Sequence, residues 1–197
     1  MSAGAWQRGI AIAVLMAAAA CAWAKPPDEP PPPTAPAPEA APAAEEPILT
    51  GEVTREQVEE FLPDWVQEEV AAQPDAAAVQ ALAAVPAGAE VTVYLGTWCS
   101  DSRRELARFW RVLDEAGGTL PFALRYVAVG RDKNEPAALT AGAGLLYVPT
   151  FVVERDGREV GRIVEAAPRG IEGDLAALLD GTASGVVSAR EDLPPQP

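Results

Sequence analysis

The sequence predicts an α/β domain, a three-layer α/β/α sandwich with a mixed sheet, preceded by extra N-terminal helices. Three observations indicate this fold. Short runs rich in β-branched and aromatic residues alternate with amphipathic helical stretches, a hairpin signal follows late in the chain, and helical patterns precede the first run. Alternating strands and helices favour parallel pairing with helices on both faces, and the hairpin adds an antiparallel edge.

Helical patterns open the domain. Thr54 is a candidate N-cap for a helix with an apolar position at Val58, and Pro63 interrupts that helix before a second amphipathic stretch that begins near Trp65. Asp75 is a candidate N-cap for an alanine-rich helix that extends to about residue 85. We therefore expect three short helices before the first strand.

Strands and helices then alternate. The stretch after Cys99 places Leu106, Phe109 and Leu113 on one face at helical spacing, and the pair Asp156-Gly157 is a strong hairpin-turn signal. From these patterns we expect strands over residues 90–96, 122–129, 150–154 and 159–164, and helices over 100–116, 135–146 and 171–179.

The first 24 residues predict export from the cytoplasm. Arg8 supplies a positive charge, and residues 9–20 form an apolar run that is shorter than the ~20 residues of an ordinary spanning helix. Two processing routes remain open. Cleavage after Ala24 would remove residues 1–24 as a signal peptide, whereas a lipoprotein signal over 1–20 would leave Cys21 as an acylated N-terminus. Both routes predict a periplasmic or cell-envelope protein, either soluble or attached to the membrane by an N-terminal lipid.

Composition divides the remaining chain into three parts. Residues 25–47 hold ten of the twenty prolines, which favour extended geometry, so we expect a semi-stiff, disordered linker there. Residues 48–183 are long enough to form one core and are the predicted domain. Residues 184–197 end in a proline-rich stretch and are expected to be a disordered tail.

Composition also excludes several kinds of chemistry. The chain has no His, which excludes Ser-His-Asp and Cys-His catalysis and His-ligated zinc. Its net charge of −14 argues against a nucleic-acid partner, since phosphate backbones are bound by clustered Lys and Arg. Two cysteines cannot build a four-thiolate metal site. We therefore expect no metal and no cofactor.

One thiol remains as the candidate reactive group. Cys99 follows Trp98 at the end of a predicted strand and directly precedes a predicted helix, whose N-terminal dipole stabilises a thiolate relative to a thiol. The alternative is that Cys99 is a small buried hydrophobic residue, as free cysteines often are. If Cys21 is removed or acylated, Cys99 is the only free thiol of the mature chain. In an oxidising compartment a free thiol is prone to oxidation, unless the fold shields it or the function of the protein requires it.

These features resemble the thioredoxin superfamily over about residues 50–182. Trp98-Cys99-x-x-Ser102 opens a helix after a strand, and Val148-Pro149-Thr150 leads into the hairpin about fifty residues later. The resemblance implies a thioredoxin-like fold with a cis Val148–Pro149 bond beside the cysteine. It also implies that residues 148–150 form a platform for the substrate backbone. Trp98, which lies beside the thiol in the sequence, is a candidate cover for the site.

Two departures from the family limit the chemistry. Ser102 replaces the second cysteine, and its hydroxyl could hydrogen-bond a thiolate but could not resolve a mixed disulfide. Val93 stands where many thioredoxins carry a buried carboxylate. What remains is monothiol thiol-disulfide exchange, in which Cys99 forms reversible mixed disulfides with a client protein or a low-molecular-weight thiol. The alternative is a non-catalytic binding or scaffold domain of the bacterial cell envelope.

Overall fold

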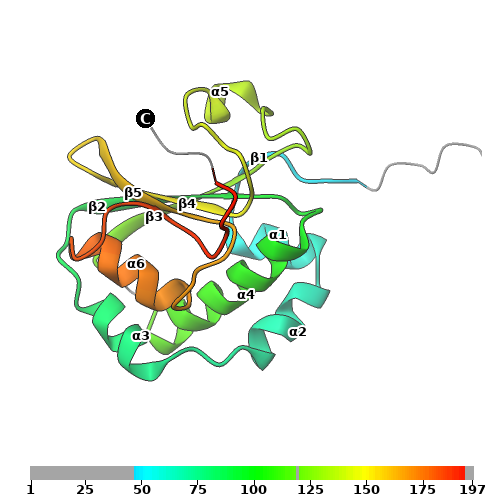
Figure 1. Cartoon of the computed structure of the whole chain (residues 1–197). Helices are drawn as coiled ribbons and strands as arrows, with labels where there is room; N and C mark the ends of the chain where they lie inside the picture. Colours follow the sequence, from blue (N-terminus) through cyan, green and yellow to red (C-terminus); the bar gives the residue numbers. More distant parts are fainter. Residues whose placement is uncertain (1–46, 119, 194–197) are drawn as a thin grey trace, which may run out of the picture. The chain divides into compact units, whose positions relative to one another are not determined.

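The computed structural model describes residues 47–118 and 120–193 (Figure 1). The predicted signal segment with Cys21, and the predicted linker up to residue 46, lie outside the described residues. Within the described ranges, every helix is too short or too polar to cross a membrane.

Twelve elements make up the described part of the chain. In order they are β1 (Gly51–Val53), α1 (Arg55–Phe61), α2 (Asp64–Ala71), α3 (Ala76–Ala83), β2 (Ala89–Leu95), α4 (Ser100–Glu115), β3 (Phe122–Ala128), α5 (Ala137–Thr140), β4 (Thr150–Arg155), β5 (Arg158–Val164), α6 (Ile171–Leu179) and β6 (Gly185–Val187). The three early helices, the four predicted strands and the last helix are confirmed, with ends within about two residues of the predicted ones.

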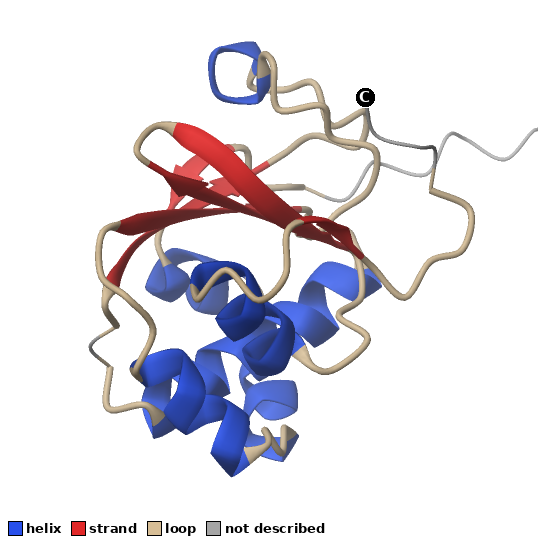
Figure 2. Ribbon diagram, turned by 60° about the vertical axis from the view of Figure 1, so that its left-hand side comes forward, coloured by secondary structure: helices blue, strands red, loops and turns tan. Residues whose placement is uncertain are grey.

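The strands form one mixed sheet in the order β1-β3-β2-β4-β5-β6. The central β2 and β3 are parallel, whereas β2 with β4, β4 with β5, and β1 with β3 are antiparallel. Helices lie on both faces, although unequally: α5 lies on one face and the other helices lie on the opposite face (Figures 1 and 2). These observations confirm the predicted mixed α/β fold.

Local capping explains where the early helices begin. The hydroxyl of Thr54 accepts a hydrogen bond from the N–H of Gln57, while the side chain of Gln57 accepts one from the N–H of Thr54. This reciprocal arrangement satisfies two N–H groups that a helix start leaves open. Asp75 caps α3 in the same sense, because its Oδ1 accepts from the N–H of Ala78 at 2.8 Å.

Three predictions about the sheet and its surroundings were wrong. The tail expected from residue 184 contains β6, which pairs in parallel with β5, so this edge of the sheet is not antiparallel. The approach of β6 depends on Gly161, since a Cβ there would lie 2.7 Å from the carbonyl oxygen of Gly185. The helix expected over residues 135–146 is only the four-residue α5, and β1 was not foreseen.

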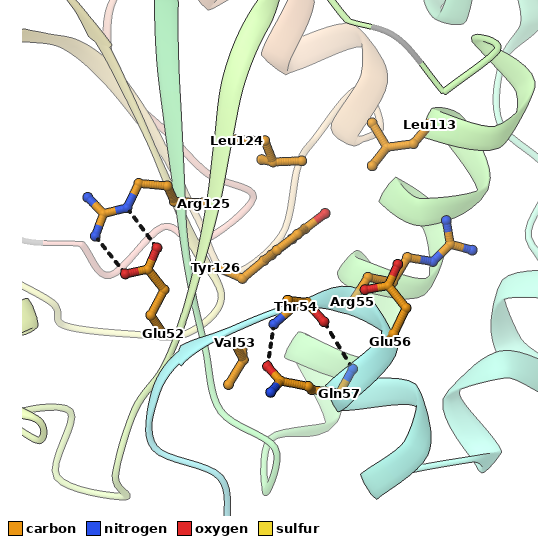
Figure 3. A pocket seen from close by; sticks show the side chains of 10 residues that line it. All are labelled: Glu52, Val53, Thr54, Arg55, Glu56, Gln57, Leu113, Leu124, Arg125 and Tyr126. Carbon is orange, nitrogen blue, oxygen red and sulfur yellow. Dashed lines mark hydrogen bonds and ion pairs between the residues drawn. The ribbon is translucent and has the colours of Figure 1, made fainter.

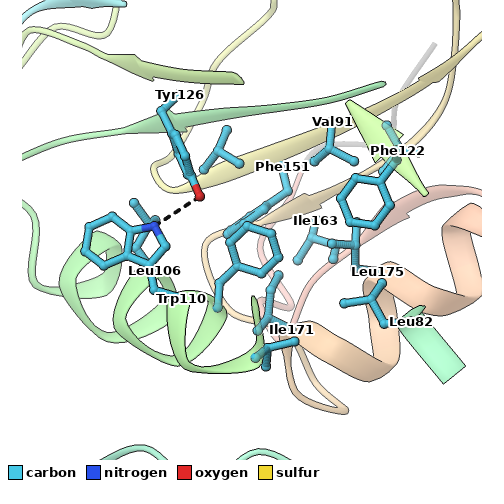
Figure 4. Close-up of a cluster of buried hydrophobic side chains, with 14 of the residues drawn as sticks. Leu82, Val91, Leu106, Trp110, Phe122, Tyr126, Phe151, Ile163, Ile171 and Leu175 are labelled. Atoms are coloured by element: carbon cyan, nitrogen blue, oxygen red, sulfur yellow. Dashed lines mark hydrogen bonds between the residues drawn. The ribbon is translucent and has the colours of Figure 1, made fainter. Parts of the chain in front are cut away.

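The core fixes α4 against the sheet (Figure 4). Phe109 of α4 meets Phe151 of β4 edge to face, with ring centroids 5.3 Å apart. Trp110 is fully buried, and its indole N–H donates to the hydroxyl of Tyr126 at 3.1 Å. Because both contacts join α4 to strands, the first turn of α4 has a defined position at the end of β2.

Candidate functional site

A second, smaller apolar cluster lies at the carboxyl ends of β2 and β3. Its buried members are Val127, Val129 and Val148, and Trp98 and Cys99 pack against them. Leu139 and Leu145, from α5 and the segment after it, also pack against this cluster. The fold therefore brings Trp98-Cys99 and Val148, which are fifty residues apart in the sequence, to one place.

Cys99 is the N-cap residue of α4 and is partly exposed. Its N–H donates to the carbonyl of Gly96 at 3.0 Å, and its own carbonyl accepts from the N–H of Arg103 at 3.1 Å. Its thiol donates to the carbonyl of Val148 at 3.2 Å. The side chain thus lies at a helix N-terminus, where the dipole favours negative charge, and directly beside the segment that precedes β4.

The segment around Pro149 has the geometry that the resemblance implies. The Val148–Pro149 bond is cis, which confirms that prediction, and both residues are buried. The hydroxyl of Thr150 donates to the carbonyl of Tyr147 at 2.7 Å, and the carbonyl of Pro149 accepts from the N–H of Glu165 at 2.7 Å. These bonds hold the segment in place, so Val148 presents its carbonyl to the thiol.

Ser102 has a different contact from the expected one. It is fully buried, and its hydroxyl accepts a hydrogen bond from the N–H of Gly96 at 3.0 Å. Among the described residues, no hydrogen bond joins Ser102 to Cys99. Ser102 therefore fastens the first turn of α4 to the end of β2. Val93 is also fully buried, and it leaves this part of the core apolar.

Trp98 lies over the end of the sheet. Its indole N–H donates to the carbonyl of Val129 at 3.1 Å, and the guanidinium of Arg131 lies 5.6 Å from the ring centroid. A Cβ on Gly96 would come within 2.8 Å of the indole. Gly96 thus has three contacts at this site, to Trp98, Cys99 and Ser102. This role of Gly96 was not predicted, although a glycine between a strand and the Trp-Cys pair was its signal.

Buried carboxylates connect the helices around the site, among them Glu172 and Glu69. Glu172 of α6 is fully buried and accepts hydrogen bonds from the guanidinium of Arg108 and from the N–H of Asp75. Burial by itself raises the pKa of Glu172, but these hydrogen bonds outweigh it and the pKa is lowered. The carboxylate therefore joins the starts of α3 and α6 to α4.

Glu69 of α2 is another buried carboxylate. It contacts the guanidinium of Arg55, which also binds Glu59 and Asp114. Burial raises the pKa of Glu69 to about 7, although Arg55 opposes this shift. Its Oε2 atom is buried without a hydrogen-bond partner among the described residues.

The described ranges hold no group of three or more side chains able to bind a metal ion together. Comparison with models of protein families and with curated proteins finds no match.

Several solved structures are similar to the chain at low identity. A protein of unknown function from Pseudomonas aeruginosa is 16% identical, with a TM-score of 0.47, over 64% of this chain and 86% of that one. A thioredoxin from Aeropyrum pernix is 20% identical, with a TM-score of 0.34, over 50% of this chain and 77% of that one. Mitochondrial thioredoxin 3 from Saccharomyces cerevisiae is 16% identical, with a TM-score of 0.32, over 58% and 98% respectively. Likenesses of this size assign neither an activity nor a family to the chain.

Proposed function

We propose that this chain is an exported thioredoxin-like protein that performs monothiol thiol-disulfide exchange. Cys99 is the nucleophile, and its partner is a client protein or a low-molecular-weight thiol. The proposed localisation is the periplasm or cell envelope, with Cys21 as a lipid attachment site if the chain is processed as a lipoprotein. The proposal requires no metal and no cofactor.

One observation carries the proposal: Cys99 is a partly exposed residue, and its sulfur lies 3.2 Å from the carbonyl of Val148. A cysteine that served only as core packing would be fully buried. Here the sulfur is instead beside the segment on which, by resemblance, a substrate backbone would lie. Val148, Pro149 and Thr150 are the proposed platform, and Trp98 is the proposed cover.

The proposed reaction balances without a second cysteine. The Cys99 thiolate attacks one sulfur of a disulfide, a new bond to Cys99 forms, and the other sulfur leaves as a thiolate that takes up a proton. A second, external thiol then attacks the mixed disulfide and releases Cys99. Since Ser102 cannot take this step, the resolving thiol must come from another molecule.

Trapping of mixed disulfides in the producing cell tests this proposal. Cells are acid-quenched, free thiols are alkylated, and species linked to the chain are separated without reductant and identified by mass spectrometry. We expect reducible adducts with the wild-type chain and none with Cys99→Ala, while Ser100→Ala serves as the neighbouring control. If the native chain forms no adduct and its Cys99 is alkylated only after denaturation, the proposal is wrong.

The second candidate function is a non-catalytic binding or scaffold domain. The burial of Ser102 and its bond to Gly96 favour it, because they give that position a structural role. On this reading Cys99→Ser leaves partner capture from envelope extract intact, whereas substitutions around Val148–Pro149 that leave the chain folded weaken it. Loss of capture in Cys99→Ser, reversed in wild type by reductant, favours the exchange reaction instead.

A further inference from the structure

The chain continues past β6 along the turn that follows β5. The hydroxyl of Ser188 donates to the carbonyl of Val164 at 2.7 Å, and the N–H of Ala189 donates to the carbonyl of Ala166 at 2.9 Å. Residues 188–192, called the strap below, are therefore fixed to this turn by backbone contacts. The turn itself contacts the proposed platform, so the strap lies close to the site.

Arg190 of the strap contacts a neighbour of the platform on each side. Its guanidinium lies over the ring of Tyr147, 4.0 Å from the centroid, and donates to the carboxylate of Glu165. Tyr147 directly precedes Val148, and the N–H of Glu165 donates to the carbonyl of Pro149 at 2.7 Å. One side chain therefore joins the two segments that hold the platform in place.

The backbone of Glu165 indicates that its side chain is needed at this position. Glu165 has a φ of 62°, in the left-handed region that glycine adopts freely and that other residues adopt at a cost. Backbone strain of this kind persists where surrounding contacts hold it, and it gathers at functional sites. What glutamate provides here and glycine would not is the carboxylate that binds Arg190. The strain thus accompanies the link between the turn and the strap.

The contacts of Arg190 require an arginine. Asp192 accepts two hydrogen bonds from its guanidinium, at 2.8 and 2.7 Å, which fixes the plane of the group over Tyr147. The side chains of Arg190 and Glu165 are 29% and 16% exposed, so water and salt screen this pair less than a fully exposed one. A lysine would keep the charge, but it could not stack on the ring and donate to two carboxylates in one plane.

We propose that Arg190 is a positioning residue of the exchange site, which acts through Tyr147 and Glu165 to hold the platform ready for a client backbone. This inference rests on the proposed exchange reaction of Cys99. Arg190 takes no part in the exchange of bonds at the sulfur. It should therefore matter for substrates that pair with Val148 through a peptide backbone, and not for small disulfides that need only the thiol.

Two disulfides with the same leaving group test this difference on the full-length chain. In the first, 5-thio-2-nitrobenzoate is linked to the cysteine of acetyl-Thr-Cys-Val-amide, and in the second it is linked to 2-mercaptoethanol, which has no peptide backbone. Attack by the Cys99 thiolate on the aliphatic sulfur forms the mixed disulfide and releases the coloured aromatic thiolate, whose absorbance gives the rate. Cys99→Ala provides the background rate.

We expect Arg190→Ala to lower the second-order rate constant for the peptide disulfide about three- to tenfold. The rate constant for the 2-mercaptoethanol disulfide should stay unchanged, and Arg190→Lys should recover part of the loss. Arg125→Ala is the matched control, because Arg125 also pairs with a carboxylate at an edge of the sheet, that of Glu52 on β1, but at the edge opposite to β6 (Figure 3). It should leave both rate constants unchanged.

The amide of Glu165 gives a second readout, which does not depend on the reaction. Its hydrogen exchange, measured by NMR, should be faster in Arg190→Ala than in the wild type, because its bond to Pro149 is then less well held. An equal loss of rate with both disulfides would mean that Arg190 acts on the thiol or on the whole fold. That result, unchanged rates, or a faster reaction of the peptide disulfide would overturn the inference while the proposed function stands. A wild-type chain that reacts with neither disulfide would overturn both.

Discussion

The buried carboxyl of Glu69 should make the domain less stable as the pH rises through neutrality. In the unfolded chain a glutamate ionises near pH 4.5, whereas burial raises the pKa of Glu69 in the fold to about 7. Below pH 4.5 the Glu69 carboxyl is protonated in both the folded and the unfolded state, so its ionisation does not change the free energy of unfolding there. Between pH 4.5 and about 7 the unfolded state loses its proton first, which progressively favours unfolding. Above about pH 7 the carboxyl is ionised in both states, and the decrease in the free energy of unfolding is complete.

The size of the effect follows from the difference between the pKa values of Glu69 in the unfolded and the folded state. Each pKa unit corresponds to ~1.4 kcal/mol, so the loss between pH 4.5 and 8 approaches ~3 kcal/mol. The pKa of about 7 already includes the attraction between Arg55 and the ionised form, and Asp114 keeps its own charge, since its hydrogen bond to Arg55 lowers its pKa. We therefore expect the free energy of unfolding to decrease by about 2–3 kcal/mol between pH 4.5 and 8.

Urea unfolding at a series of pH values between 5 and 8 measures this loss. The absence of His leaves few other groups titrating in this range, although Glu105, whose pKa burial also raises, contributes with the same sign. Glu69→Gln should remove most of the decline, whereas Glu68→Gln, exposed on the same helix, should retain it. A wild-type stability that is flat or rises from pH 5 to 8, or an equal decline in Glu69→Gln, would refute this reasoning.

Three further substitutions test the packing around the site. Phe109→Ala removes a fully buried ring and should lower the free energy of unfolding by about 3–5 kcal/mol, measured in urea. Glu172→Ala leaves Arg108 without its bidentate partner and should cost about 2–3 kcal/mol by the same measurement, while Glu172→Gln recovers part of it. Gly96→Ala forces the indole of Trp98 to move and should cost about 1–3 kcal/mol. It should also change the alkylation rate of native Cys99, followed by mass spectrometry; an unchanged rate and stability would contradict the packing described for Gly96.

Much of the fold could be predicted because its signals are local. Capping residues such as Thr54 and Asp75, and the turn at Asp156-Gly157, act within a few residues of the structure that they determine. The edge strands β1 and β6 have only three residues each, so no alternation of side chains marks them. β1 forms because it pairs with β3, and β6 forms because it pairs with β5 and the missing side chain of Gly161 leaves room for it. Both are tertiary effects.

The site was predictable in its members but not in all its contacts. The Trp98-Cys99 pair and the Val148–Pro149 bond lie together as the resemblance implies. Ser102 was expected to face the thiol, but its neighbours on the helix show why it does not. Leu106 and Phe109 follow it at four and seven residues, so all three share the buried face of α4. The helical spacing alone would have placed this hydroxyl in the core.

The contacts of Cys99 connect ionisation of the thiol to binding of a substrate backbone. In the described structure the sulfur lies 3.2 Å from the carbonyl of Val148, to which only a protonated thiol can donate. A thiolate has no proton to donate, and its charge repels the carbonyl oxygen at the same distance. Deprotonation therefore frees the Val148 carbonyl at the moment the sulfur becomes nucleophilic. An N–H of an incoming peptide could then replace the lost hydrogen bond and compensate the repulsion. On the proposed mechanism, a substrate that pairs with Val148 thereby stabilises the reactive form of Cys99, without a second thiol or a carboxylate in the chain.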